Sequence, residues 1–355
     1  MKKKRLQTLQ ILLSALGAAA FGSGILISPQ TASQGVREGL ALCGQVVIPS
    51  LFPFLVLSSF LVQSGLTQRA GRLLGPVTRL AFRLPGTAGS AILMSLIGGY
   101  PVGARMTAQL LDASLITKKQ AQRMLLFCIN SGPAFLISAV GSAMLRSRRA
   151  GLILCAALTA SALLIGLFAR FLAAQEPLKE SLDLPPAEPA MAQALVDAAT
   201  QGCAGILSIC VWMILFSCIA ALLGLLPLPG TPRIFLQCFL EVTSGCALAA
   251  GKVPLPALAL VLGWGGICVH CQVLRDVNKT GLPLPIFFCG RAVNGLLACL
   301  ISTGLFRLFP CETAVFSNHV QALPEAFAAS APVAAGMLFM CALLILEVEG
   351  RRKKC

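Results

Sequence analysis

The chain has 355 residues, of which 57% are hydrophobic and only 12% are charged, and its mean hydropathy is +0.84. Soluble domains carry about 25% charged residues, so this composition excludes a water-facing catalytic domain of any size. The net charge of +15 lies in short runs between apolar segments, which is typical of membrane-surface loops and not of nucleic-acid binding. We therefore expect an all-α polytopic membrane protein in contact with the lipid bilayer.

No enzyme or cofactor motif is present, because the sequence contains no phosphate-binding loop, HExxH pair or nucleophile elbow. Most of the 15 cysteines lie inside apolar stretches, where they act as small hydrophobic residues. Cys268-Val-His-Cys271 has the spacing of a metal knuckle, but no second pair of ligands accompanies it. We therefore expect no enzyme activity, no cofactor and no metal.

The N-terminal part predicts two membrane helices and a surface segment. A basic start precedes the apolar residues 8–28, which are long enough to cross and lack an A-x-A cleavage site, so we expect a retained helix rather than a signal peptide. Residues 40–65 contain Pro49 and Pro53 and should kink. Residues 67–84 alternate arginine with large apolar residues, which indicates an amphipathic surface helix or, alternatively, a basic loop.

Two interrupted segments follow. Residues 85–117 are apolar around Gly98-Gly-Tyr-Pro-Val-Gly103 and basic at both flanks, so the chain should enter and leave on the same face as a re-entrant hairpin. Residues 121–145 contain Asn130-Ser-Gly-Pro133 and predict a broken helix. Residues 150–172 form an ordinary spanning segment, and residues 175–189 form a polar, proline-rich linker.

The order of elements recurs after the linker. A long apolar segment and a mixed stretch over residues 227–252 precede a second hairpin over residues 254–282 and a second broken helix over residues 284–308. We therefore predict two membrane repeats, residues 1–148 and 149–310, followed by a C-terminal loop, a last helix over 331–346 and a basic tail within residues 311–355. Three crossings in each repeat would invert the second, and secondary transporters of this plan bind substrate where interrupted segments meet. The alternative is kinked helices that pack through small residues.

Charges inside the bilayer mark the candidate site, because each costs roughly 2.5–3.5 kcal/mol on insertion scales. A guanidinium holds a carboxylate through two hydrogen bonds, so Arg105 and Arg291 are candidates for binding an organic anion, with snorkelling to the surface as the alternative. Asp112 is a candidate for a coupling proton. The interruptions supply the other candidate substrate-binding residues, of which the histidine has a structural role as its alternative: Gly98, Gly99, Gly103, Asn130, Ser131, Gly265, Gly266, His270 and Asn294.

Two motifs carry a resemblance to a known family. At Gly98-Gly-Tyr-Pro-Val-Gly-Ala104 and Cys128-Ile-Asn-Ser-Gly-Pro-Ala-Phe135 the sequence resembles the YlbJ-type sporulation integral membrane proteins. These carry nucleoside-recognition, or gate, domains and are distantly similar to concentrative nucleoside transporters. The resemblance implies a multi-pass protein of the outer forespore membrane that moves dipicolinic acid toward the spore.

The sequence thus predicts a secondary transporter or facilitator for a small organic anion, with dipicolinic acid implied by the resemblance. A nucleoside or nucleobase transporter is the first alternative, although no carboxylate accompanies the interruptions as it does around a bound nucleoside. A non-transporting membrane scaffold in sporulation is the second alternative. The charge pattern does not fix the orientation, and it leaves open whether the chain forms a homo-oligomer.

Overall fold

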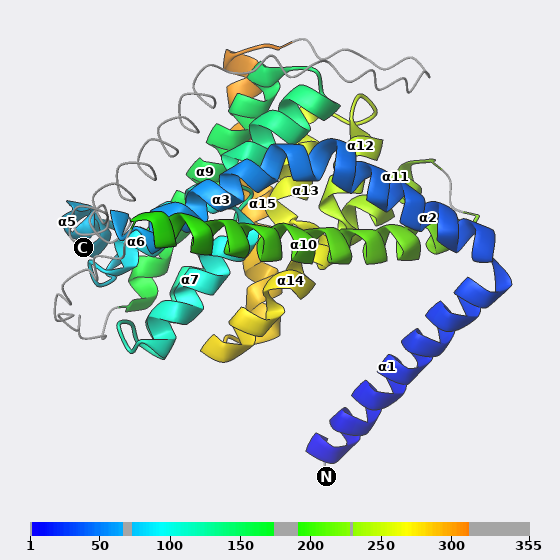
Figure 1. The fold of residues 1–355 in the computed structure, drawn as a ribbon, viewed down its shortest axis with the longest axis horizontal. Helices are drawn as coiled ribbons and strands as arrows, with labels where there is room; N and C mark the ends of the chain where they lie inside the picture. The colour runs from blue at the N-terminus through cyan, green and yellow to red at the C-terminus, as the bar shows by residue number, and fades with distance from the viewer. Residues whose placement is uncertain (1, 67–72, 174–190, 228–229, 312–355) are drawn as a thin grey trace, which may run out of the picture.

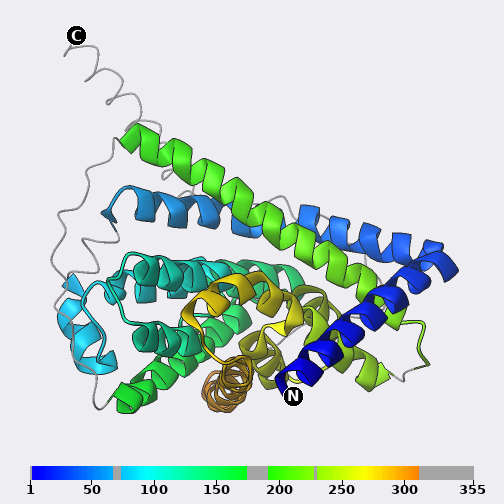
Figure 2. The ribbon, with the colours of Figure 1, turned by 90° about the horizontal axis from the view of Figure 1, so that it is seen from below.

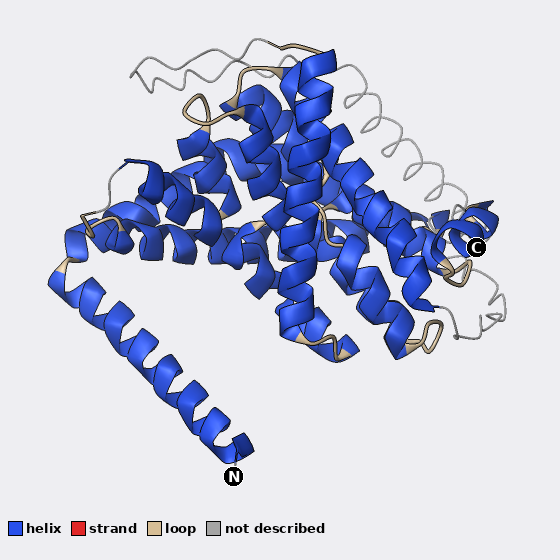
Figure 3. Cartoon of the chain, turned by 180° about the vertical axis from the view of Figure 1, so that it is seen from behind, coloured by secondary structure: helices blue, strands red, loops and turns tan. Residues whose placement is uncertain are grey.

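The structure, a computed structural model, describes residues 2–66, 73–173, 191–227 and 230–311. Within these residues every regular element is a helix (Figure 3). Five helical stretches are long and apolar enough to cross a membrane: Pro29–Gln63, Arg148–Leu172, Met191–Leu223, Leu255–Leu274 and Leu284–Leu308. The prediction of an all-α polytopic membrane protein is confirmed. The predicted linker, last helix and basic tail lie outside the described residues.

The first helices lead from a projecting end into the body of the protein. Helix α1 (Lys2–Ile27) points away from the rest, and α2 (Pro29–Leu42) follows it (Figure 1). A π-helical turn, η1 (Cys43–Val47), joins α2 to α3 (Ile48–Gln63), which holds one proline at its start and another inside. Proline has no backbone N–H to donate to the preceding turn. The wider π turn before the two prolines accommodates them, and the helix continues through the segment where the sequence predicted a kink.

The rest of the first half contains a folded-back pair and a broken helix. After the short helix α5 (Gly75–Phe82), α6 (Ala88–Gly98) and α7 (Tyr100–Asp112) pack against each other across Gly99, whose φ of 82° suits glycine. Helix α8 (Lys118–Phe127) stops before the interruption at residues 128–133, and the π-helix η2 (Ala134–Met144) continues from it. Helix α9 (Arg148–Ala169) and a short turn, η3 (Arg170–Ala173), complete this half.

The second half begins with α10 (Met191–Leu223) and continues with α11 (Gly230–Leu240) and α12 (Val242–Ala249), which pack against each other across Glu241. Helices α13 (Leu255–Trp264) and α14 (Gly266–Thr280) meet at Gly265. Helix α13 packs along α15 (Leu284–Leu308), whereas α14 packs against α7, so the two helices diverge from their junction instead of folding back. The folded-back pair of this half is thus α11–α12 and not residues 254–282.

The prediction of a broken helix over residues 284–308 is wrong, because α15 is continuous. Its Asn294-Gly295 pair suggested a break but serves close packing instead. A Cβ atom added to Gly263 would lie 2.5 Å from the Gly295 Cα atom, so α13 and α15 touch through their backbones. Small residues allow this close approach without interrupting either helix.

Both halves nevertheless share one order of elements: a long helix, a folded-back pair, a broken helix and a continuous helix. The order runs α2–α3, α6–α7, α8–η2 and α9 in the first half, and α10, α11–α12, α13–α14 and α15 in the second. The change from one series to the next falls within residues 174–190, later than the predicted boundary after residue 148. The inverted relation of the two halves stays a prediction.

The helices form two layers. Helices α2–α3 and α10 pack side by side as a long-helix pair, which crosses the remaining helices on one side (Figure 2). We call α6–α9 and α11–α15 with η2 the broken-helix bundle. Its main hydrophobic core takes residues from both halves, including Leu125, Leu136, Leu258 and Leu262, so the two halves fold around one interior.

Gly103 should be indispensable for this packing. A Cβ atom there would lie 1.7 Å from the Cys128 carbonyl oxygen, so Gly103→Ala must push α7 away from the interruption in α8–η2. Overpacking of this kind costs roughly 1–3 kcal/mol, and we expect a lower melting temperature in detergent. Gly304→Ala on α15 is the control, because a Cβ atom there meets open space. Equal melting temperatures of the two variants would contradict the described packing.

Candidate functional site

The four interruptions of the bundle meet in one place. A Cβ atom on Gly99 would lie 3.3 Å from the Gly132 backbone nitrogen, which places the α6–α7 turn against the break in α8–η2. A Cβ atom on Gly265 would lie 3.3 Å from the Tyr100 ring, and one on Gly266 would lie 3.0 Å from the Val242 backbone nitrogen. The α13–α14 break therefore contacts both folded-back pairs, one from each half.

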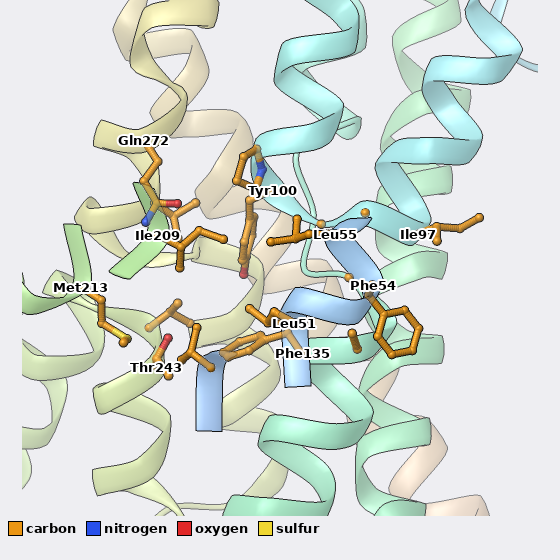
Figure 4. Close-up of a pocket in the computed structure, with 18 of the residues that line it drawn as sticks. Leu51, Phe54, Leu55, Ile97, Tyr100, Phe135, Ile209, Met213, Thr243 and Gln272 are labelled. Atoms are coloured by element: carbon orange, nitrogen blue, oxygen red, sulfur yellow. The ribbon is translucent and has the colours of Figure 1, made fainter. Parts of the chain in front are cut away.

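A cavity lies at this meeting point, between the long-helix pair and the bundle (Figure 4). Its empty volume is about 660 Å³, which includes the space at its open side. The long-helix pair lines it with the apolar residues Val47, Leu51, Phe54, Leu55, Ile209 and Met213. The bundle lines it with Ile97, Gly98, Gly99, Tyr100, Pro101, Gly132, Ala134, Phe135, Glu241, Val242, Thr243, Val269 and Gln272.

Three helices begin at the cavity without a side-chain cap in the described part of the chain: α7, η2 and α14. Their first turns contribute Tyr100, Ala134 and Val269 to the lining. The first amides of a helix lack partners within it, and the start of a helix carries a partial positive charge. Such ends favour anions, so these three helix starts are positive features of the lining, whereas Glu241 and the end of α6 at Gly98 are negative features.

Among the described residues of the lining, Glu241 carries the only charged side chain. It is 2% exposed, and its carboxylate accepts hydrogen bonds from the backbone amides of Thr243, at 2.9 Å, and Ser244. Glu241 thus caps α12, and the start of that helix balances its negative charge. In the sequence Glu241 lies in the mixed stretch over residues 227–252 and was not among the predicted site residues. The signal that could have revealed it is a lone acid before Thr and Ser in an apolar segment.

Arg291 has a different role from the one predicted. Its side chain is 1% exposed and does not line the cavity. One terminal nitrogen donates to the Ile129 carbonyl, and the other donates to the Gly263 carbonyl at 2.7 Å. These carbonyls lie where α8 and α13 end, and the ends of helices carry partial negative charge. The guanidinium therefore joins the two broken helices of opposite halves and neutralises their ends.

Other predicted site residues serve the same breaks. Asn294 donates to the Gly263 carbonyl at 3.1 Å and accepts from the Ser161 hydroxyl at 2.9 Å. The Tyr100 hydroxyl donates to the Leu262 carbonyl at 2.5 Å and accepts a hydrogen bond from Ser131. These side chains form hydrogen bonds with carbonyl groups that have no helical partner where a helix breaks. In the bilayer core, where water is absent, such groups need a partner within the protein.

Two further predicted residues are also turned inward. The His270 Nε2 atom forms a hydrogen bond with the Trp264 carbonyl at 2.9 Å, and its ring lies edge-on to that of Trp264. Asn130 donates to the Phe127 carbonyl at the end of α8. Both are buried and lie outside the lining, in keeping with the structural alternative for His270.

The structure does not bring Arg105 and Arg291 together in the cavity. Arg105 is exposed on α7, whereas Arg291 is buried between the ends of α8 and α13. Of the predicted site residues, only Gly98 and Gly99 line the cavity, while Gly103 packs against the Cys128 carbonyl. The conspicuous polar residues at the interruptions therefore lie in the protein interior and outside the lining.

Comparison with known proteins identifies the family. A family model described as nucleoside recognition, or Gate, matches residues 45–228, just over half of the chain. The chain belongs to the Gate family. This match spans both motifs of the earlier resemblance. The sporulation integral membrane protein YlbJ of Bacillus subtilis (strain 168), a curated protein, is 27% identical over 324 residues, which cover 80% of this chain and 79% of that protein. No solved structure matches the chain.

The resemblance noted in the sequence is thereby confirmed. Membership of the Gate family, together with the spanning helices, supports a multi-pass membrane protein with a transporter-like role and not an enzyme. The Gate match includes the α6–α7 pair and the α8–η2 break, which supply one side of the cavity.

Removal of the Arg291 guanidinium should destabilise the protein in the absence of any ligand. Hydrogen bonds to a charged group contribute roughly 1.5–3 kcal/mol each, and Arg291→Met removes two of them. We expect a melting temperature well below that of the parent in detergent, with Arg291→Lys intermediate. Arg307→Met, an exposed position on the same helix, is the control and should melt like the parent. An Arg291 that bound only ligand would leave the ligand-free melting temperature unchanged.

Proposed function

We propose that the protein is a secondary transporter or facilitator for a small organic anion. The observation that carries the proposal is the cavity on which three uncapped helix starts converge. Each helix start is equivalent to roughly half a positive charge. The negative ends of α8 and α13 are turned away, to Arg291. The three helix starts therefore favour a negative solute, against the opposing charges of the α6 end at Gly98 and of Glu241, which the start of α12 balances in part.

The lining also suits reversible binding. Hydrophobic side chains such as Leu51, Phe54 and Phe135 can cover a planar ring, while Thr243 and Gln272 supply neutral hydrogen-bonding groups. A fixed cation would hold a carboxylate tightly, whereas helix dipoles attract it without forming an ion pair. Transport requires binding that is favourable yet weak enough for release.

Dipicolinic acid is the substrate that we propose first, because it joins an aromatic ring to two carboxylates. The sporulation protein named above supports a role in spore formation, with the outer forespore membrane as the proposed location. Nucleoside transport is the second candidate, because the Gate family model is described as nucleoside recognition and because a carboxylate, which the sequence did not reveal at the interruptions, lines the cavity as Glu241. A non-transporting scaffold is the third, and it would require no substrate in the cavity.

A transport assay on purified protein in liposomes separates these candidates. We expect time-dependent uptake of labelled dipicolinate that excess unlabelled dipicolinate blocks and dipicolinamide, its uncharged analogue, does not. Competition by nucleosides but not by dicarboxylates would favour the second candidate. Absence of uptake for the whole panel of anions and nucleosides would favour the scaffold.

Filling the cavity should stop transport without unfolding the protein. Leu51→Trp on α3 places a larger ring in the lining, and we expect the uptake rate to fall at least tenfold, because the substrate loses its space. Leu57→Trp is the matched control, since Leu57 lies on the same helix, is 41% exposed and is absent from the lining. Size-exclusion profiles and melting temperatures of both variants report on folding. Normal uptake by Leu51→Trp would exclude this cavity as the substrate site.

A further inference from the structure

A polar stripe leads from the cavity along α7. Pro101 lines the cavity at the start of this helix, and Arg105, Gln109 and Asp112 follow at spacings of four, four and three residues. Residues at such spacings lie on one face of a helix. All three polar residues are exposed. The face of α7 that begins at the cavity is therefore polar as far as the end of the helix.

A second polar stripe follows α14 in the same way. Gln272 lines the cavity, and Asp276 and Lys279 follow at spacings of four and three residues. Helices α7 and α14 pack against each other, and Figure 1 shows them side by side. At their far ends the Lys279 Nζ atom lies 2.9 Å from the Asp112 carboxylate. The two stripes thus run together from the cavity to one end of the bundle.

Hydrocarbon is an unfavourable environment for the first of these exposed groups, Arg105. With a rise of 1.5 Å per residue, Arg105 lies about 7 Å along α7 from Tyr100, so it is still well inside the bilayer if the cavity is near the midplane. A charged residue that faces hydrocarbon there costs roughly 2.5–3.5 kcal/mol. Arg105 has no hydrogen-bonded or ion-paired partner among the described residues that would offset this cost. The Arg105 guanidinium must therefore reach water, either through an aqueous cleft beside it or by snorkelling to the membrane surface.

We propose that the paired stripes of α7 and α14 line an aqueous vestibule between the cavity and one membrane surface, in which Arg105 attracts the organic anion. The part played by Arg105 rests on the proposed function, whereas the presence of water along the stripes does not. A cation inside a cleft with low-dielectric walls raises the local concentration of anions and their rate of entry. The Lys279–Asp112 ion pair marks the outer end of the vestibule.

Cysteine accessibility tests the vestibule independently of any substrate. We expect Arg105→Cys, whose short side chain cannot reach the membrane surface from this depth, to react with a membrane-impermeant maleimide applied to both faces of the liposomes. The parent protein, with its 15 native cysteines, sets the background. Leu300→Cys is the lipid-facing control, since Leu300 is 69% exposed on α15 and should stay unlabelled. Failure of Arg105→Cys to react above background would overturn the vestibule.

Charge replacement tests Arg105. We expect Arg105→Cys to lower initial dipicolinate uptake about tenfold at low ionic strength and less at high salt. Aminoethyl methanethiosulfonate, which restores a positive charge, should rescue uptake, whereas the negatively charged sulfonatoethyl reagent should not. Lys119→Cys, an exposed cation on α8 outside the stripes, should transport normally with or without reagent.

The outcomes of the two experiments are separable. Labelling of Arg105→Cys together with normal uptake by the same variant would overturn the role of Arg105. Rescue of Arg105→Cys by both reagents would do the same, because restored bulk and not restored charge would then explain it. If the parent protein carries no anion, the proposed function fails, and the labelling result still decides whether the stripes are water-lined.

Discussion

The architecture depends on the way Arg291 joins two broken helices. A helix that stops inside a bilayer leaves carbonyl groups without partners, and each unsatisfied group costs several kcal/mol. Arg291 supplies donors to Ile129 at the end of α8 and to Gly263 near the end of α13. Its planar guanidinium suits two acceptors, and their partial negative charges offset the cost of burying the cation. The other ends of the interruptions remain available for a ligand.

The same arrangement makes each half depend on the other. Arg291 reaches from the second half to the break of the first, and Tyr100 reaches from the first half to the Leu262 carbonyl of the second. Ser161 on α9 likewise donates to Asn294 on α15. Each interruption thus has at least one carbonyl, Ile129 in the first half and Leu262 in the second, that accepts from a side chain of the other half. The cavity is therefore a property of the assembled pair, and the Tyr100–Leu262 and Arg291–Ile129 contacts that join the two halves each span 162 residues of the chain.

The sequence allowed the membrane class and the first-half interruptions to be predicted, because Pro101 and Pro133 lack a backbone N–H and the glycines beside them adopt non-helical backbone geometry at little cost. It misled at Asn294-Gly295, since a glycine that breaks a helix and one that admits a neighbouring helix look alike in a single sequence. The α11–α12 turn was missed because Glu241, and not glycine or proline, forms it. The charge of Arg291 was conspicuous, but its partners lie 162 and 28 residues away, so its direction was beyond prediction.

The two layers contribute different kinds of groups to the cavity. The described residues that the long-helix pair contributes to the cavity are all apolar, whereas Glu241, Thr243, Gln272 and the uncapped helix starts belong to the bundle. An anion in the cavity would therefore owe its electrostatic stabilisation to the bundle alone. The long-helix pair would exclude water and lipid, but its apolar side chains would form no hydrogen bonds with the substrate. Selectivity for charge would then depend on the broken helices. Arg291 would contribute to this selectivity indirectly, because it holds the ends of α8 and α13 in place.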